Sequence, residues 1–587
     1  MPFWFIALLF IGSILAGELL RPRPKDNSKP ATLSDFNFPT ADESRPIPVV
    51  WGTVKIDGPN IIWYGDLQAT QLSRNVKTGL FSSTKQTLGF RYSIGVDYAL
   101  CFGPVDAILE IRTDNKLAWL PTGIETPPTD SGGTGQEFVV DARTIYGGDA
   151  DFQLEAGGFG GTYAVCTFYS GRPTTTVNGY LSGVLNPAPV PAYNNICRVV
   201  WQGPSNGKAV YNGNFFNEPF KSGYMGTANQ LTPLEFIIKR CPNTLSTALL
   251  DTEYLIVDAN NANQADANPA DALYELLTNN LWGINIPTNL FDFNSFKSAQ
   301  HQCFVDKLGF SAVWDTPKEI IDVMNELLNY MDAVLYTDLE TGLIAIKLAR
   351  TDYDVENILT LNEDNCIVTS YSRASWAETT NEVRVNYLER RTEGSTIGTL
   401  GTIFREKTAV AQDLANFRIQ NSVVATNISY LGPTNGTAAS KLAYRDLRIL
   451  SRPLIKLNIK TYRGTSMLRP ADVFKLNWKD YELNITNQVF RVTKIRYGNL
   501  SDNSMELEAV EDVFGVQNSI YSNPTPTEWE DPNQEPLGLT NFVIKEAPYF
   551  YSGDNVKLQV IAEKPDVWQL SYNVYEGNTN SPSDMSI

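Results

Sequence analysis

The sequence predicts a mainly β protein with α/β insertions, an α+β chain of several domains, and three observations carry this prediction. The chain has 587 residues, of which 43% are hydrophobic and 11% aromatic, enough for several packed cores at roughly 150 residues per domain. Short runs rich in Val, Thr, Tyr and Phe stand between turn residues, with 33 prolines and 41 glycines in the chain, which favours strands over long helices. Helical periodicity is confined to the middle of the chain and one later segment.

The charge balance excludes one broad class of function. The chain contains 47 Lys and Arg residues against 65 Asp and Glu residues, and its formal net charge is −18. A protein that binds nucleic acid by neutralising phosphates needs a basic surface, whereas this chain repels phosphate backbones overall. We therefore expect no dedicated binding of DNA or RNA.

The cysteines lie dozens of residues apart, and no C-x-x-C pair occurs that would form a local zinc or redox site. A secreted disulfide scaffold is much denser in cysteine. We expect small buried hydrophobic residues in a chain that folds in a reducing cytoplasm, with long-range disulfides as the alternative. The residues are Cys101, Cys166, Cys197, Cys241, Cys303 and Cys366.

Residues 1–34 form an apolar segment and a proline-rich tether. Residues 2–17 carry no basic n-region of the kind that opens a signal peptide. As a helix of about 1.5 Å per residue they reach roughly 24 Å, short of the roughly 30 Å hydrocarbon core of a membrane. A cleaved signal and a membrane anchor are alternatives, and we favour a segment buried in an assembly. Its large apolar residues are Phe3, Trp4, Phe5, Ile6, Leu8, Leu9, Phe10 and Ile11.

Residues 35–230 predict a first β domain. The strands IPVVWGTVKI and IIWYGDL flank the turn DGPN at 57–60. A second pair, FRYSIGVDYALCF and DAILEIRTDNKLAW, is joined by Gly103 and Pro104. Residues 203–229 are loop-like, and we expect a surface insertion there. The first strand has two occupied faces, because one set of residues alternates with the other: Val49, Trp51 and Thr53 against Val50 and Val54.

Residues 231–345 predict an α/β middle domain. Asn268 caps a helix with Pro269 at its first position, and Gly283 is placed to end it. A second helix is expected from the capping-box spacing of Thr316 and Glu319. The first helix has an apolar face of Leu273, Leu276, Leu277 and Leu281, and the second has a core-facing stripe of Ile320, Met324, Leu327, Leu328, Met331 and Leu335.

The rest of the chain predicts a second β-rich domain and a small module. Residues 346–520 return to hairpin patterns, interrupted by a helix at roughly 438–450 that ends before Pro453. Residues 521–587 read as a Pro, Asn and Glu-rich linker followed by alternating strands of a small β sandwich.

The residue types and spacings of the sequence predict no catalytic, cofactor-binding or metal-binding site. His301 is the single histidine of the chain. This excludes most catalytic arrangements that need a general base with a pKa near neutral pH. His301 and Cys303 fall short of the three protein ligands that a zinc site needs. Asp271 and Glu275 have helical i, i+4 spacing, and we expect a solvated helix face. We therefore predict that the chain is not an enzyme. A glycosidase that uses two carboxylates stays an alternative, because Asp and Glu residues are abundant.

Five segments, in order, resemble a known family. They are RPIPVVWGTVKIDGPNIIWYGDL, LCFGPVDAILEIRTDNKLAW, NPADALYELLTNNLWGINIP, YSRASWAETTNEVRVNY, and LRPADVFKLNW with FRVTKIRYGNLSDNSMELEAVEDVF. This series is similar to the tail-tip (baseplate) hub proteins of long-tailed, siphovirus-type bacteriophages, the family of the lambda-type tip attachment protein and the gene-transfer-agent hub. The resemblance covers roughly residues 39–515.

The resemblance implies two tail-tube-like β-barrel domains, at 35–230 and 346–520, around the small helix-containing middle domain. Residues 521–587 lie beyond this resemblance, and their strand pattern predicts the C-terminal β-sandwich-like (fibronectin III-like) module. The residues that match the family's motifs are expected in structural roles: Arg45, Pro46, Pro48, Gly52, Gly58, Trp63, Gly65, Gly103, Pro104, Trp376, Asn381, Arg384 and Asp512.

The function that the resemblance implies is a structural hub at the virion tail tip, assembled in the host cytoplasm as a homotrimer. Its partners would be distal tail and tape-measure proteins, tip or fibre proteins, and host envelope lipid through the N-terminus. The apolar segment would plug the channel until DNA ejection, and an acidic lumen would let DNA pass without specific binding. The alternative is an exported β-rich carbohydrate-active protein or adhesin with a cleaved signal peptide.

Overall fold

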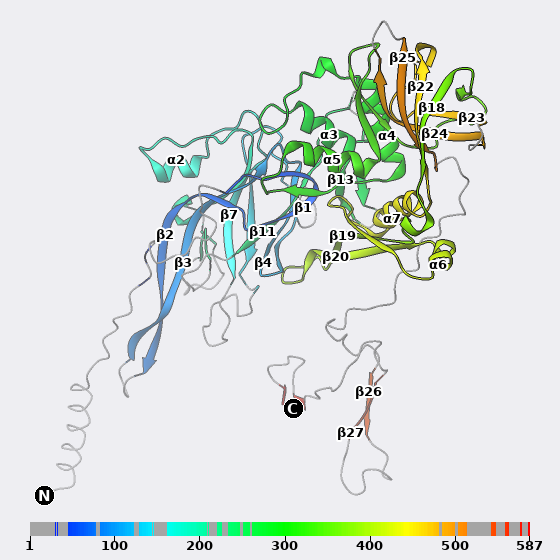
Figure 1. Cartoon of the computed structure of the whole chain (residues 1–587). Coiled ribbons are helices and arrows are strands. Elements are labelled where there is room, and N and C mark those ends of the chain that lie inside the picture. The colour runs from blue at the N-terminus through cyan, green and yellow to red at the C-terminus, as the bar shows by residue number, and fades with distance from the viewer. Residues whose placement is uncertain are drawn as a thin grey trace, which may run out of the picture. The chain divides into compact units, whose positions relative to one another are not determined.

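The computed structural model divides the chain into two compact units, residues 1–519 and 520–587 (Figure 1). The eight apolar residues of the N-terminal segment lie outside the described residues. The structure describes residues 30, 32, 45–77, 83–121, 128–143, 145, 161–207, 209–210, 220–225, 233–246, 251–258, 261–465, 467–479, 484–498, 503–513, 542–546, 558–562, 576–577 and 585–586.

Two five-stranded sheets enclose the first core of the larger unit. Apolar residues from both sheets, among them Val50, Ile94 and Phe236, are fully buried in one cluster. The first sheet has the order β14 (Ala312–Trp314), β1 (Val49–Asp57), β11 (Leu234–Arg240), β4 (Ala107–Thr113), β5 (Lys116–Trp119). The second has the order β2 (Asn60–Lys77), β3 (Ser83–Phe102), β8 (Ile196–Trp201), β7 (Thr162–Tyr169), β6 (Gln136–Ala142).

Strand β1 packs into two cores, as its alternation predicts. Val50 and Val54 belong to the cluster between the two sheets. Val49 and Trp51 point to the other side and join a second cluster that contains the helices of the middle of the chain. The prediction of two occupied faces is confirmed, and β1 is the element that both cores share.

Strands β2 and β3 continue beyond the sheets as a two-stranded ribbon, the long blue pair in Figure 1. Their pairing runs from Asn60 opposite Ala99 to Lys77 opposite Ser83. Strand β8 pairs only with the stretch of β3 from Val96 onward. On the N-terminal side of Val96, the backbone of Gly223, Tyr224 and Met225 forms third-strand contacts with β3.

The second core is helical. Asn268 caps α3 by accepting a hydrogen bond from the amide of Ala270 at 3.0 Å, so this predicted start is confirmed. The helix ends at Thr278 rather than near Gly283. The elements around this core are α3 (Pro269–Thr278), α4 (Phe293–Asp306), α5 (Ile320–Met331), β12 (Leu255–Asp258), β13 (Asn261–Ala267), β15 (Ala333–Thr337) and β16 (Ile344–Leu348).

Three details of the expected helices are wrong. Helix α5 begins at Ile320 with Glu319 as a cap that makes no side-chain hydrogen bond, so the expected capping box from Thr316 is not formed. The carbonyl of Thr316 instead accepts from the indole of Trp314, at the end of β14. Leu281 follows the end of α3 and is exposed, and Leu335 lies in a strand.

The second β region contains a six-stranded sheet and a three-stranded sheet. Helix α7 covers one face of the smaller sheet and confirms the helix expected at roughly 438–450. The larger sheet has the order β17 (Thr360–Leu361), β23 (Val473–Lys479), β24 (Asn484–Tyr497), β25 (Ser504–Glu511), β22 (Ile455–Tyr462), β18 (Cys366–Arg373). The smaller has the order β20 (Gly401–Gln412), β19 (Glu382–Glu393), β21 (Ala425–Ser429), beside α6 (Leu414–Gln420) and α7 (Gly436–Leu450).

The fold confirms a mainly β chain with a few helices. The six cysteines, all within the described residues, are buried and unpaired, as expected for small hydrophobic residues. Within the region expected as a surface insertion, the described residues Ser222, Tyr224 and Met225 are buried and contribute to the core. The described residues contain no helix long and apolar enough to cross a membrane. Short elements complete the larger unit: α2 (Gly179–Leu185), β9 (Ala209–Val210) and β10 (Phe220–Lys221).

The first sheet also contains strands from the middle of the chain. Strands β11 and β14 come from residues 231–345, yet both lie in the first sheet beside β1. In the smaller unit two strand pairs are described, and the β-sandwich-like module stays a prediction. The pairs are β26 (Phe542–Glu546) with β27 (Leu558–Ala562), and β28 (Glu576–Gly577) with β29 (Met585–Ser586).

Candidate functional site

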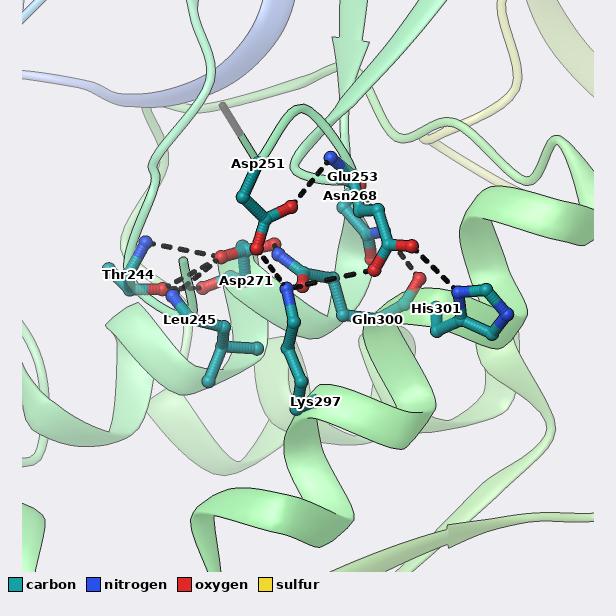
Figure 2. A network of polar contacts seen from close by, with 9 residues as sticks. All are labelled: Thr244, Leu245, Asp251, Glu253, Asn268, Asp271, Lys297, Gln300 and His301. Atoms are coloured by element: carbon teal, nitrogen blue, oxygen red, sulfur yellow. Dashed lines mark hydrogen bonds and ion pairs between the residues drawn. The ribbon is translucent and has the colours of Figure 1, made fainter. Parts of the chain in front are cut away.

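The single histidine belongs to a polar network between α4 and the loop before β12 (Figure 2). His301 Nδ1 lies 2.7 Å from Glu253 Oε1, and the histidine side chain is 61% exposed. Lys297 Nζ lies 3.6 Å from Glu253 Oε2 and also bonds Asp251. Each charged group has a protein partner, so the network fastens the loop to the helix.

Asp271 lies at the buried end of the same network. Its carboxylate accepts hydrogen bonds from the amides of Thr244 and Leu245, at 3.1 and 3.0 Å, and from Gln300 Nε2 at 2.6 Å. Burial raises the pKa of Asp271 to about 6, against the lowering effect of these donors. The expected solvated face of Asp271 and Glu275 is therefore wrong: α3 is enclosed on nearly all sides, and both carboxylates are buried.

The raised pKa of Asp271 makes a prediction about pH. A carboxyl whose pKa is higher in the folded state stabilises the fold most below its unfolded pKa, and this contribution is lost as the pH rises through about 6. The unfolding free energy of the wild type minus that of Asp271→Asn should fall by about 2 kcal/mol between about pH 4 and pH 7. Urea unfolding across this range measures it, and a constant difference would contradict it.

A buried polar cluster lies where β1, β13 and β19 meet. Asp266 Oδ1 accepts from Arg390 Nη1 at 2.7 Å and from Ser311 Oγ at 2.6 Å, and its Oδ2 accepts from Thr434 Oγ1 at 2.8 Å. Thr53 joins through its amide, which donates to Ser311 Oγ at 3.1 Å, and its carbonyl, which accepts from Arg390 at 3.3 Å. The carboxylate of Asp266 is thus connected, directly or through Ser311 and Arg390, to segments of both β regions and of the middle of the chain.

A second ion pair fixes α3 to β1 and β11. Arg240 Nη1 donates to the carbonyl of Val50 at 2.9 Å and to Glu275 Oε2 at 3.0 Å, and its Nη2 bonds Glu275 Oε1. The indole of Trp51 donates to Glu275 Oε2 at 3.1 Å. This bidentate geometry is the strong form of an arginine–carboxylate pair.

A third contact brings the end of the β19–β20 pair to β4. The amide of Thr402 donates to Glu110 Oε2 at 2.8 Å, and its hydroxyl also bonds Glu110. Arg112 Nη1 donates to the carbonyl of Thr402 at 2.6 Å, and Gln264 Nε2 donates to its hydroxyl at 2.8 Å. We call these three contacts together the buried junction. Its members are Thr53, Asp266, Ser311, Arg390, Thr434, Val50, Trp51, Arg240, Glu275, Glu110, Arg112, Gln264 and Thr402.

The motif residues of the opening segment shape the entry to β1 and the turn after it. Arg45 Nη1 donates to the carbonyl of Gly58 at 2.5 Å. The carbonyl of Pro46 accepts from Asn60, and that of Pro48 from the amide of Phe102 at 2.9 Å. In the same segment Gly52 and Gly58 have positive φ, as does Asp66 near its end.

Trp63, Gly65 and Gly103, the next motif residues, lie where an aromatic ring or the backbone of another segment comes close. The ring of Trp63 packs edge-on against Tyr180 at 6.3 Å. Gly65 leaves room for that indole, because a Cβ there would be 2.8 Å from it. Gly103, before Pro104, lies against the backbone of Ser170 and Gly171, where a Cβ would come within 2.4 Å of a carbonyl oxygen.

The later motif residues hold other parts of the fold. Asn381 is buried and clamps the loop before β21, because its Nδ2 donates to the carbonyl of Ser422 at 2.7 Å. Arg384, which is partly exposed, pairs with the buried Glu382, and Trp376 is exposed. Asp512 accepts from Arg491 Nε at 2.9 Å at the end of the six-stranded sheet. The motif residues therefore do not gather into one pocket.

Sequence reasoning missed most of the buried junction. Its carboxylates and arginines stand in strand patterns that read as half-exposed, and their partners lie 124 residues apart for Asp266 and Arg390. One pattern could have indicated these pairs: a charged residue at a strand position whose side chain faces the core, as with Arg240 at the end of β11. The described residues contain no group of three or more His, Cys, Asp or Glu side chains suited to a metal ion.

Comparison with known proteins gives structural likenesses and no sequence relatives. The sequence matches no protein-family model and no curated protein. A chain in the virion of a native gene transfer agent particle is similar over 89% of this chain and 100% of its own length, with 13% identity and a TM-score of 0.46.

Two tail proteins are similar over smaller shares of this chain. The prophage MuSo2 43 kDa tail protein from Shewanella oneidensis covers 69% of this chain and 98% of its own length, at 11% identity and a TM-score of 0.25. The tail protein from Neisseria meningitidis MC58 covers 70% of this chain and 97% of its own length, at 10% identity and a TM-score of 0.26. All three TM-scores lie below 0.5, so these likenesses do not by themselves assign a function.

Proposed function

We propose that this chain is a structural hub of a bacteriophage tail tip, which closes the tail tube and connects it to tip or fibre proteins. Its role is to hold a fixed geometry, without catalysis. It acts in host attachment and in passage of the genome, and DNA moves past an acidic surface that does not bind it specifically.

The observation that carries this proposal is the composition of the buried junction. Val50, Trp51 and Thr53 come from the first segment with family resemblance, Glu110 and Arg112 from the second, and Glu275 from the third. Arg390 follows three residues after the fourth segment. The segments that resemble hub proteins therefore supply the first-region side of the contacts that connect the β regions, together with Glu275, as expected if geometry is the function.

The proposed hub contains three copies of this chain. Two β regions in each chain would present six similar surfaces in a trimer, which matches a sixfold tube to a threefold tip. A map of the particle, or mass measurement of isolated tips, should count three copies per tail. One copy or six copies at the tip would contradict this stoichiometry.

The proposed plug is the apolar N-terminal segment, residues 1–17. The eight large apolar side chains within residues 3–11 would each gain about 1.5 to 3 kcal/mol on full burial, so they need a cover. In the tail this cover is the other copies or the tape-measure protein, and host lipid after release.

Deletion of residues 1–17 should leave the β-rich body folded, because the proline-rich tether separates the two. Particles with the deletion should lose infectivity, and a Gly/Ser segment of equal length should not restore it. Circular dichroism of the purified chain and plaque counts measure the two effects. Full infectivity of the deletion particles would contradict the plug.

A further inference from the structure

A pocket of about 420 Å³ lies where α5, α7 and β21 meet. This volume is within the usual range of ligand-binding pockets. Part of its lining is apolar and reaches the surface, because Leu431 and Leu450 are 53% and 37% exposed. The pocket thus combines an apolar rim with an excess of carboxylates. The charged residues that line it are Glu326, Asp332, Arg445 and Asp446.

Two of the three carboxylates in this lining have partners in their own chain. Lys318 Nζ lies 3.1 Å from Glu326 Oε1, and Asp446 accepts from Arg445 Nε at 2.9 Å. Asp332 differs, because its Oδ2 is buried and has no hydrogen-bond partner in the part of the chain that the structure describes. A buried carboxylate oxygen without a donor is costly for the fold. Such a group in a pocket is a candidate functional position.

Three arginines act on the charge of Asp332, yet each of them pairs with another carboxylate. Burial raises the pKa of Asp332, against the lowering effect of these arginines. Counted together, the cluster has three guanidinium groups and four carboxylates, and Asp332 is the carboxylate left over. The pairs are Arg445 with Asp446, Arg350 with Asp306, and Arg491 with Asp512.

The pocket also lies at the negative end of a helix. Asp332 is the C-cap of α5, where the helix dipole disfavours a carboxylate and favours a cation. Arg445 already uses this helix end, because its Nη1 and Nη2 donate to the carbonyls of Tyr330 and Asn329 at 2.8 and 3.1 Å. The helix end and the unpartnered carboxylate oxygen therefore both favour a second positive charge in the pocket.

We propose that this pocket receives a lysine or arginine side chain from an apolar segment of another protein, with Asp332 as the partner of its charge. The alkyl stem of a basic side chain packs on apolar surface while its charged end meets the carboxylate, and Leu431 and Leu450 supply that surface. A second copy of this chain fits less well, because its net charge of −18 has the same sign as the pocket. In the proposed hub the partner is another tail protein, but the chemistry of the pocket does not depend on that role.

The first test measures binding of three blocked tripeptides, Leu-Arg-Leu, Leu-Lys-Leu and Leu-Gln-Leu, to the purified full chain by isothermal titration. At least one basic peptide should bind about tenfold more tightly than the glutamine peptide, because only a cation uses the carboxylate. Asp332→Asn should remove this preference, and Asp352→Asn, at an exposed position, should keep it. Equal binding of the three peptides, or no binding, would overturn the proposal.

A second variant keeps this test decisive if Asp332→Asn does not fold, which urea unfolding would show. Leu431→Ser changes an exposed rim position and should weaken the basic peptides by about threefold or more, because apolar contact is lost. Leu339→Ser is the matched control, since Leu339 is 60% exposed and lies outside the pocket. Binding that is unchanged by Leu431→Ser would contradict the assigned rim.

The second test identifies the partner in assembled tails. Benzoylphenylalanine in place of Leu450 should, on irradiation, cross-link the chain to a different tail protein at a peptide that contains Lys or Arg. The same residue in place of Leu339 should not give this product. No product, a product with a second copy alone, or a cross-linked peptide without Lys or Arg would overturn the proposal. If the chain is absent from tails, the hub proposal fails, and the peptide titration still decides the pocket.

Discussion

An Asp266→Ala variant should lose about 3 to 5 kcal/mol of unfolding free energy, because removal of one partner leaves the other charge of a buried ion pair uncompensated. Arg390 and Asp266 are both nearly inaccessible to solvent. The same substitution removes the acceptor of Ser311 and Thr434 hydroxyls. Each buried donor left without an acceptor adds to the loss.

The size of this effect is testable against a matched variant. Asp352 is exposed on the surface of the same unit, and Asp352→Asn should change the stability by less than about 0.5 kcal/mol. Asp266→Asn keeps the side-chain volume, and its loss of unfolding free energy should lie between those of Asp266→Ala and Asp352→Asn. Urea unfolding followed by tryptophan fluorescence measures all three. An Asp266→Ala variant as stable as Asp352→Asn would show that the junction contributes little to stability.

A Gly52→Ala variant should be destabilised by about 2 to 5 kcal/mol, from a left-handed backbone and an overpacked contact together. Gly52 has a φ of +73°, and a Cβ there would lie 2.0 Å from Ser311 Oγ and 2.7 Å from the carbonyl oxygen of Phe310. The second neighbour is backbone, so a rotamer change does not relieve the clash. Movement of this segment would also pull Ser311 away from Asp266.

Gly183 provides the matched control for Gly52. It lies in α2, and a Cβ there would meet no atom within 4 Å. Gly183→Ala should be neutral or stabilising by up to about 1 kcal/mol, since alanine favours helix. Thermal unfolding of the two variants separates steric strain from a general effect of losing a glycine. Equal melting temperatures would contradict the role assigned to Gly52.

Short sequence patterns predicted those helices and strands whose formation depends on residues close together in the chain. The cap Asn268 with Pro269 marks the start of α3, and the alternation around Trp51 marks a strand with two buried faces. Helix α4 escaped prediction because its apolar residues form only a weak stripe, with Phe296, Ala299 and Cys303 buried among polar neighbours. The expected capping box before α5 failed because β14 pairs with β1 up to Trp314 and the helix starts later.

The buried junction was beyond sequence reasoning for a different reason. Whether a carboxylate such as Glu275 is solvated or buried depends on what covers its helix, and α3 is covered by β1 and β11 from distant parts of the chain. A spacing of four residues describes one helix face and carries no information about that cover. Charge pairs inside sheets, such as Asp97 with Arg198, pose the same difficulty.

The long-range contact between Thr53 and Arg390 also sets an order of events during synthesis. These residues are 337 positions apart, so at roughly 5 to 20 residues per second the ribosome needs about 20 to 70 seconds to make the second after the first. β1 is made at the start of that interval, and over its last 124 residues Asp266 has been made while the arginine that neutralises it has not. The nascent chain therefore holds an unpaired carboxylate and an uncovered strand face, which makes the first half of the protein a natural client for chaperones until β19 arrives.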